Sequence, residues 1–395
     1  MKADRSDHAK PATPGFAALT VVLILFFVMA LVAAYTNRNL IFEQRISSSS
    51  YQAARALHAA DAAQDWTLAM LNAGRIDSAC QPSTDEANSD FRRRYLTESI
   101  DSGYDVVRRG APLAQWLRPA CVFTVAGEMA CICPSMANPD PAIPLTDGMG
   151  SAFSVRFILP GNAVRPGTLA LLARGCATPG TGASSCLTQT DDRPIVDALV
   201  STQATLGLLR ALPNAPVAVL TANGAITGMG DANKPATLPA VTDEAGFSAL
   251  FGMDRVTYQR QPGVVRMACN GVCTSSNLGP VLAGHPRNTI WVQGDLTLDT
   301  AGPLGNAVDP MMLIVTGTLS VAANAKIFGF VHANRIAWAA GAEAASLQGA
   351  MVSATDFAAT TAPNLSYNKE LLDIIRLRYG SFVRVPGGWN LTSLQ

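Results

Sequence analysis

The stretch that decides the fold is FAALTVVLILFFVMALVAAYT, residues 16–36, which contains no charged residue, no glycine and no proline. At 1.5 Å per residue, a helix of this length is about 30 Å long and matches the hydrocarbon core of a bilayer. The first fifteen residues carry a slight basic excess, with Lys2, Arg5 and Lys10 against Asp4 and Asp7. This bias predicts a cytoplasmic N-terminus and an extracytoplasmic body. The stretch therefore predicts a single-pass membrane anchor.

The anchor continues into a longer helix. The 58 residues between Gly15 and Gly74 include neither glycine nor proline, and the pattern predicts one unbroken helix that Gly74 caps. In its outer part, small and apolar residues recur at helical spacing: Ala53, Ala56, Ala60, Ala63 and Met70. A cleaved secretory signal would need a shorter apolar core and a small-residue cleavage site, and is disfavoured. An ordinary signal anchor remains an alternative.

The rest of the chain favours short strands. The full chain has 32 glycines and 24 prolines, and they are frequent after residue 74, which indicates many turns. VQGDLTL (292–298) aligns with VTGTLSV (315–321) at an offset of 23, and AKIFGFVHAN (325–334) aligns with ASLQGAMVSA (345–354) at an offset of 20. Such repeats are typical of stacked β-solenoid rungs, with an ordinary antiparallel sheet as the alternative. The predicted class is α+β, a long helix followed by a mainly β body.

The eight cysteines predict disulfides, because their even number suits a compartment outside the cytoplasm. Cys176 and Cys186 flank a turn-rich loop, Cys269 and Cys273 flank Asn-Gly-Val, and each pair is close enough to bond locally. The pairing of the other four stays open: Cys80, Cys121, Cys131 and Cys133. A zinc site is disfavoured, since none of the four histidines lies at ligand spacing from a cysteine.

Three segments resemble type IV pilus proteins. PGFAALTVVLILFF (14–27) resembles a class III signal, which implies that prepilin peptidase cuts after Gly15 and methylates the new amine of Phe16. YTNRNLIFEQR (35–45) with ARALHAADAAQDWTLAMLN (54–72) resembles the N-terminal region of PilX-type minor pilins. YNKELLDIIRLRYGSFVRVPGGWN (367–390) is similar to the ends of such proteins.

The N-terminal segment departs from the usual pilin pattern in two ways. Thr13 and Pro14 stand where pilin leaders carry a basic residue before the glycine, and Thr20 stands at the fifth mature position, where most pilins carry Glu. We expect the Thr20 hydroxyl to bond the carbonyl of Phe16 instead. Pseudopilins of the general secretion pathway K type also lack that Glu and resemble caps at the filament tip. The resemblance thus implies a tip or priming role.

The expected organisation has five regions. They are a prepilin leader (1–15), a pilin-type helix (16–74, transmembrane over 16–36), a Cys-containing α+β region (75–220), a loop-rich linker (221–287) and a β-rich repeat region (288–395). The last region is expected to close with a helix over 368–379 and a strand over 381–385. The arginine run at Arg92, Arg93 and Arg94 is expected to be a solvated turn, with contact to a partner or to lipid as the alternative.

No enzymatic chemistry is expected. The sequence has no Gly-x-Ser-x-Gly, Walker or His-Glu-x-x-His motif, and GMGDAN (228–233) lacks a following helical pattern. Asp295, Asp299 and Asp309 do not follow the spacing of a calcium loop. The 29 basic and 29 acidic residues balance, so nothing predicts a nucleic-acid partner. We therefore expect no metal and no cofactor.

The predicted function is that of a minor pilin that promotes filament assembly at or near the tip. The expected partners are other pilins, reached through the N-terminal helix, together with prepilin peptidase and the inner membrane. The expected location is the inner membrane, with a periplasmic body, and then the surface pilus. A tip adhesin and an envelope protein unrelated to pili are the alternatives.

Overall fold

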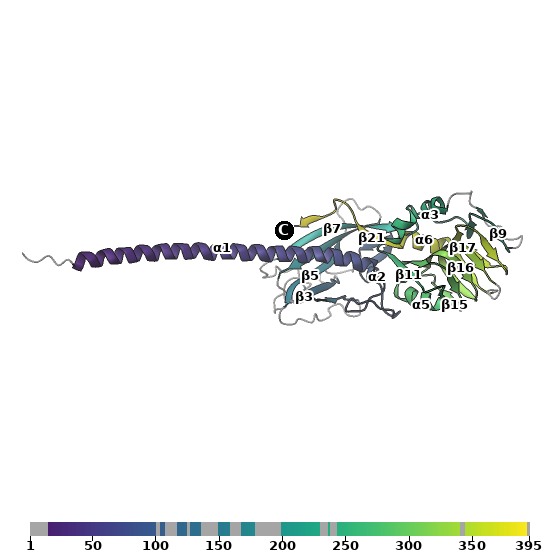
Figure 1. Ribbon diagram of the computed structural model, residues 1–395, viewed down its shortest axis with the longest axis horizontal. Coiled ribbons are helices and arrows are strands. Elements are labelled where there is room, and N and C mark those ends of the chain that lie inside the picture. Colours follow the sequence, from purple (N-terminus) through teal and green to yellow (C-terminus); the bar gives the residue numbers. More distant parts are fainter. Residues whose placement is uncertain are drawn as a thin grey trace, which may run out of the picture. The chain divides into compact units, whose positions relative to one another are not determined.

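The computed structural model describes residues 15–99, 103–106, 117–124, 127–135, 149–158, 167–177, 199–229, 236–237, 243–339 and 344–392. The chain divides into two compact units, Met1–Ala54 and Arg55–Gln395. Helix α1 (Gly15–Asn72) contributes residues to both. The expected long N-terminal helix is confirmed, and so is the mainly β body (Figure 1).

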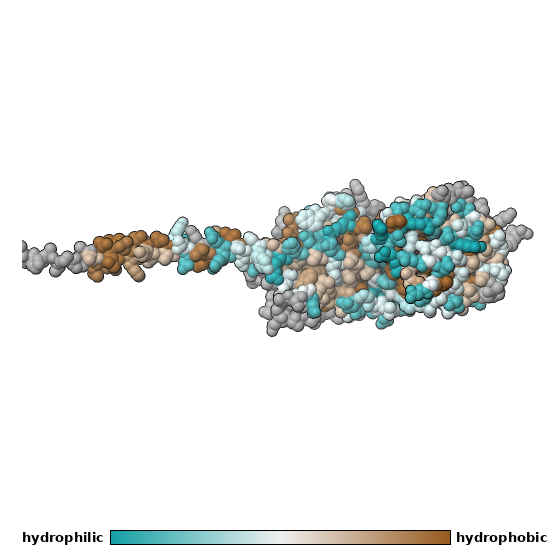
Figure 2. Space-filling model, viewed as in Figure 1, coloured by the Kyte–Doolittle hydropathy of each residue, from teal (hydrophilic) through white to brown (hydrophobic). Residues whose placement is uncertain are grey.

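The first unit consists, in its described part, of residues 15–54 of α1. Its apolar side chains from Leu19 to Tyr35 are at least half exposed, and Figure 2 shows them as an almost continuous hydrophobic surface. A soluble helix buries such residues, because exposed apolar area costs free energy in water. This part of α1 is long and apolar enough to cross a membrane, with a hydropathy of 2.7 in its most apolar window.

In the second unit, the last turns of α1 pack on an antiparallel sheet. Its strand order is β21-β7-β6-β5-β3-β4, with β22 also on β7. The strands are β3 (Ala120–Thr124), β4 (Met129–Ile132), β5 (Met149–Ile158), β6 (Thr168–Cys176), β7 (Leu199–Arg210), β21 (Gly380–Arg384) and β22 (Asn390–Thr392). Ala56, Ala60 and Ala63 of α1 are fully buried. Small residues on both elements let the helix backbone approach the strands closely.

A short helix and a hairpin follow α1 in the chain. They are α2 (Phe91–Tyr95), β1 (Leu96–Ser99) and β2 (Gly103–Val106), and β1 pairs antiparallel with β2. The side chain of Asp90 caps α2 by accepting a hydrogen bond from the backbone N–H of Arg93.

The remaining body is a parallel β-solenoid inserted into the antiparallel sheet. Strand β7 ends at Arg210, which pairs directly with Gly380 at the start of β21. The chain therefore leaves the sheet after β7, forms the solenoid, and returns to the same edge to pair antiparallel with β7. Residues 211–379 are an excursion between two neighbouring strands.

The solenoid strands stack in three parallel sets. The first set runs β10-β8-β18-β17-β16-β13-β11, the second joins β12, β14, β9 and β19 to the C-terminal parts of β16 and β17, and the third joins β15 and β20 to the N-terminal parts of β17 and β18. The strands are β8 (Leu220–Ala222), β9 (Ile226–Thr227), β10 (Ala236–Thr237), β11 (Val264–Ala268), β12 (Cys273–Thr274), β13 (Thr289–Gln293), β14 (Leu296–Leu298), β15 (Gly302–Leu304), β16 (Met311–Val321), β17 (Ala325–Trp338), β18 (Ser346–Ser353), β19 (Phe357–Ala359) and β20 (Asn364–Tyr367).

The register of these strands confirms the sequence repeats and the solenoid. Leu296 pairs with Leu319, at the predicted offset of 23. Gly329 pairs with Gly349, at the predicted offset of 20. These two glycines have φ values of 136° and 137°, and a Cβ on either would meet a backbone oxygen of the neighbouring strand at about 2 Å. Only glycine fits where the stacked strands turn this sharply.

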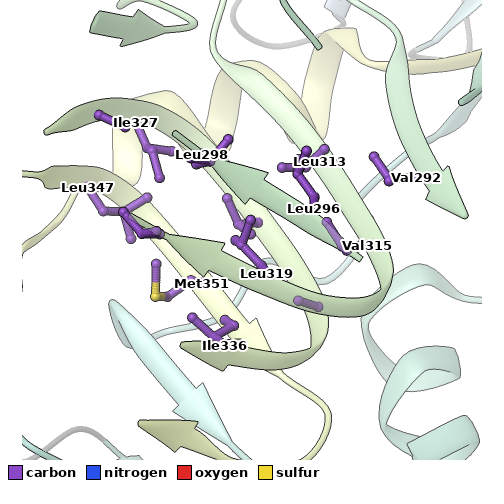
Figure 3. Close-up of a cluster of buried hydrophobic side chains, with 14 of the residues drawn as sticks. Val292, Leu296, Leu298, Leu313, Val315, Leu319, Ile327, Ile336, Leu347 and Met351 are labelled. Atoms are coloured by element: carbon purple, nitrogen blue, oxygen red, sulfur yellow. The ribbon is translucent and has the colours of Figure 1, made fainter. Parts of the chain in front are cut away.

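The solenoid has an aliphatic interior and an aromatic outer layer. Figure 3 shows leucine, isoleucine, valine and methionine side chains that point toward one another from stacked strands. The outer side of the first set is covered by three helices, α3 (Asp243–Phe251), α4 (Arg255–Gln259) and α6 (Lys369–Arg378). Phe247, Phe251 and Tyr258 pack there against Trp291 and Phe330. The aliphatic interior and the aromatic outer layer together bury the apolar area that stabilises the solenoid, since a single rung cannot bury its own faces.

The body divides differently from the regions expected from sequence. The described part of 221–287 forms solenoid rungs and the helices α3, α4 and α5 (Ser275–Gly284) in place of a linker. The closing strand expected at 381–385 is β21, but it belongs to the antiparallel sheet. The reason is that Phe382 is buried in the core beneath α1, which a local pattern does not reveal.

We expect a buried histidine of the outer layer to make the stability of the folded protein sensitive to acid. His332 is buried between the rings of Phe247 and Phe251, with centroids 5.4 and 5.6 Å away. Burial, with a smaller effect of the Arg255 charge, lowers the pKa of His332 to about 3. Because the unfolded chain binds this proton near pH 6.5 and the folded chain does not, stability falls as pH drops below 6.5.

We expect the stability lost between pH 7.5 and pH 4.5 to be about 1–3 kcal/mol smaller in His332→Phe than in the natural protein. Denaturant unfolding of the detergent-solubilised protein at the two pH values measures this difference. Equal losses in the two proteins would contradict the assignment of a neutral His332 in the folded state.

Candidate functional site

The first candidate site is the N-terminal helix itself. In the described chain, α1 begins at Gly15 and includes Phe16, and Thr20 is an exposed residue in its second turn. The leader through Pro14 lies outside the described residues. The cleavage after Gly15, the methylation of Phe16 and the Thr20 hydrogen bond stay predictions. Another threonine of the same helix, Thr36, forms a bond of the kind expected for Thr20. Its hydroxyl donates to the carbonyl of Val32, four residues earlier, at 2.9 Å.

The second candidate site is a buried polar junction where α1, the antiparallel sheet and the solenoid meet. Asn72, the last residue of α1, exchanges two hydrogen bonds with the backbone of Phe382 in β21: its Oδ1 accepts from the N–H at 2.8 Å, and its Nδ2 donates to the C=O at 2.9 Å. Its carbonyl accepts a hydrogen bond from Nδ2 of Asn288 at 3.0 Å. One residue thus ties the end of the helix to both parts of the body.

Charged side chains complete the junction. Arg287, just before β13, has a side chain that is only 2% exposed. It is paired with Glu98 of β1, and its Nε lies 3.2 Å from Asp309. Arg93 of α2 pairs with the same Asp309, and Arg378 of α6 pairs with the same Glu98. The two carboxylates are therefore shared between arginines from the α2–β1 segment and from the solenoid.

Two tyrosines close the junction. The hydroxyl of Tyr379 lies 2.7 Å from the carbonyl of Pro310 and 3.0 Å from that of Pro286. Burial raises the pKa of Tyr379 well above its ordinary value, so it keeps its single hydroxyl proton, for which both carbonyls are within hydrogen-bond distance. Tyr104 of β2 donates to the carbonyl of Arg378 at 3.0 Å. These bonds satisfy backbone groups at the solenoid's base.

The arginine run is not the solvated turn expected from sequence, and that prediction is wrong. Arg92 is buried and donates to the carbonyls of Leu71 and Gly380. Arg94 donates to the carbonyls of Ile76, Asp77 and Cys133. Three adjacent arginines look exposed in a sequence, because nothing local shows that unpaired carbonyls and carboxylates converge on them. The α2 N-cap at Asp90 is the one local signal that could have indicated a structured turn.

The cysteines are engaged in disulfides. Cys80 is bonded to Cys133, Cys121 to Cys131, and Cys269 to Cys273. Cys176 is also disulfide-bonded, and its expected partner Cys186 lies outside the described residues. The Cys80–Cys133 bond ties the segment after α1 to the edge strand β4, and the Cys121–Cys131 bond joins β3 to β4.

The aspartates considered for calcium have structural partners. Asp295 accepts a hydrogen bond from the N–H of Thr318, 23 residues further along, and Asp299 accepts one from the N–H of Ser275. Asp309 belongs to the junction. The residues that the structure describes contain no group of three His, Cys, Asp or Glu side chains that could hold a metal ion.

These features define a class of protein: a long helix with an exposed apolar N-terminal part, continuous with a disulfide-bonded, mainly β body. Within that class, residues 15–63 match the family model described as PilX N-terminal. This part of α1 is therefore similar to the N-terminal region of PilX proteins, and the match begins at Gly15. No curated protein and no solved structure matches the chain.

Proposed function

We propose that this protein is a minor pilin that promotes assembly of a type IV pilus at or near its tip. The match of residues 15–63 to the PilX N-terminal model carries the proposal. The exposed apolar surface of the same helix supports it, since such a surface needs lipid or the helices of neighbouring pilins to cover it. The inner membrane, other pilins and prepilin peptidase are the partners that this role requires.

The proposed tip position follows from Thr20. A charged fifth residue in the membrane needs a partner in the next subunit, and this need guides docking along a filament. Thr20 carries no charge and places no such demand. A subunit without it suits the end of the filament better than its repeating shaft. Detection of the protein at regular intervals along sheared filaments would contradict this position.

The inserted solenoid favours a second role as a binding module. It occupies residues 211–379 between two paired strands, so the pilin-like sheet is complete without it. Insertions at such a position are tolerated because the two ends lie next to each other. A deletion mutant with normal piliation but lost adhesion would support this second role, whereas loss of pili would support the assembly role.

The proposed function predicts the N-terminal residue of the mature protein. We expect the mature protein to begin at N-methylated Phe16, and we expect Gly15→Ala to leave nearly all of the protein in the unprocessed form, because the peptidase requires glycine before its cut. Mass spectrometry of the purified N-terminus measures both. Phe42→Ala, an exposed position in the same helix beyond the apolar run, serves as the control and should mature normally. A natural protein that begins at Met1, or beyond residue 36, would contradict the pilin pathway.

A further inference from the structure

The interior of the solenoid contains an aliphatic ladder that ends abruptly. One residue from each strand of the first set lies in register with the next, in the order Leu220, Met351, Val331, Leu313, Ile290 and Val265. The first five are fully buried. Val265, on β11, is only partly buried. The side chains of the ladder are thus covered on every strand except the last, where Val265 has no further strand packed against it among the described residues.

Strand β11 is also the end of the hydrogen-bonded stack. It pairs in parallel with β13 on one side, and no strand pairs with its other side among the residues that the structure describes. A strand edge of this kind presents N–H and C=O groups at the spacing that another extended chain needs. Two residues of this strand, Arg266 and Ala268, are exposed.

A hollow of about 480 Å³ lies against Val265. On one side it is bounded by the end of α1 and the segment after it, and on the other by α5. Its apolar lining comes from Met70, Ile76, Pro280 and Val281 in addition to Val265. This is the space into which a side chain of one more rung would project.

His285 is one of the polar residues that line the same hollow. Nδ1 of His285 is buried and has no hydrogen-bond partner. Burial lowers the pKa of His285, which favours the neutral ring. The ring of His285 therefore adds no charge to the lining of the hollow.

We propose that this hollow is a docking site for an extended segment of a partner protein, which lies along β11 as an additional rung. Its backbone pairs with the free edge of β11, and an aliphatic side chain enters the hollow and continues the ladder beyond Val265. A strand is the occupant that uses both features, because a compact apolar ligand would fill the hollow but leave the edge unpaired. The inference does not depend on the pilus assignment, since it concerns the body alone.

A peptide that copies a rung of the solenoid tests the site. The probe is a fluorescent synthetic peptide of residues 289–298, TIWVQGDLTL, which already has the inward pattern that stacks on β11. The control peptide carries serine at the inward positions Ile290, Val292 and Leu296. Fluorescence anisotropy with the full-length protein in detergent should show saturable binding of the probe and none of the control peptide.

Variants of the protein locate the binding. Val281→Arg places a charge in the hollow, and Thr84→Trp fills it from its exposed rim without altering the core. Each should weaken binding at least tenfold. Val217→Arg is the matched control, because Val217 is 90% exposed and lies beside the opposite end of the solenoid. It should bind the probe like the natural protein.

Three results would overturn the proposal. They are the absence of probe binding to the natural protein, unchanged binding to Thr84→Trp, and self-association of the natural protein that Val281→Arg abolishes. The last result would assign the hollow to a second copy of this chain. Because binding is measured on purified protein, these outcomes are independent of whether Phe16 is the mature N-terminus.

Discussion

Replacing Arg287 by alanine is expected to destabilise the second unit by about 3–5 kcal/mol, because it leaves two carboxylates without their buried partner. The Arg287 side chain is only 2% exposed and contacts both Glu98 and Asp309. Arg93 remains beside both carboxylates and Arg378 remains beside Glu98, but the side chains of both arginines are more exposed than that of Arg287. Denaturant unfolding of the full-length protein in detergent measures the loss.

The control for this experiment is Arg266→Ala. Arg266 carries the same charge on the neighbouring strand β11, but it is exposed and forms no ion pair in the described structure. We expect a change below about 0.5 kcal/mol, as for ordinary surface positions. If Arg287→Ala cost no more than Arg266→Ala, the junction would not be what holds the solenoid to the α2–β1 segment.

The second large effect is expected at Gly175. A Cβ at this position of β6 would lie 2.1 Å from the carbonyl oxygen of Ala56 and 2.4 Å from the backbone nitrogen of Ala60. Both atoms belong to the backbone of α1, so no side-chain rotation relieves the clash. Gly175→Val therefore has to push the helix off the sheet or distort the strand, at a cost of about 3 kcal/mol or more.

This change tests how the long helix is attached to its body. Unfolding midpoints and the protease sensitivity of residues 55–72 should both report a loosened helix. Gly279→Ala is the control, because a Cβ there meets nothing within 4 Å and alanine favours the helix α5. A Gly175→Val protein as stable as Gly279→Ala would show that α1 does not need this close approach.

The predictability of the fold differs sharply between its parts. The repeats at offsets of 23 and 20 predicted the strand register, because each rung of a solenoid packs on its neighbour in the chain and repeats its inward residues. The return of β21 to β7 was not predictable in this way. It depends on pairing between Arg210 and Gly380, which are separated by the whole solenoid.

The candidate sites divide in the same manner. The N-terminal helix can be predicted from its apolar composition. The match of residues 15–63 to the PilX N-terminal model agrees with the resemblance seen in the sequence. The polar junction cannot be predicted in this way, because nothing in the sequence near Arg92, Glu98, Arg287 and Asp309 shows that the fold brings these charged residues together. The strand edge at β11 is likewise visible only once the stack and its end are known.

By itself, the sequence determined an apolar helix of membrane-spanning length, its unbroken continuation and the repeating strands, since all three arise from interactions between residues close in the chain. The helix ends at Asn72, and Gly74 does not adopt the left-handed conformation expected of its cap. Only the tertiary structure decided that the solenoid is an insertion, that the arginine run bonds carbonyls and carboxylates, and that Cys80 bonds Cys133. These features depend on contacts between distant segments, where burial and charge pairing outweigh local preference.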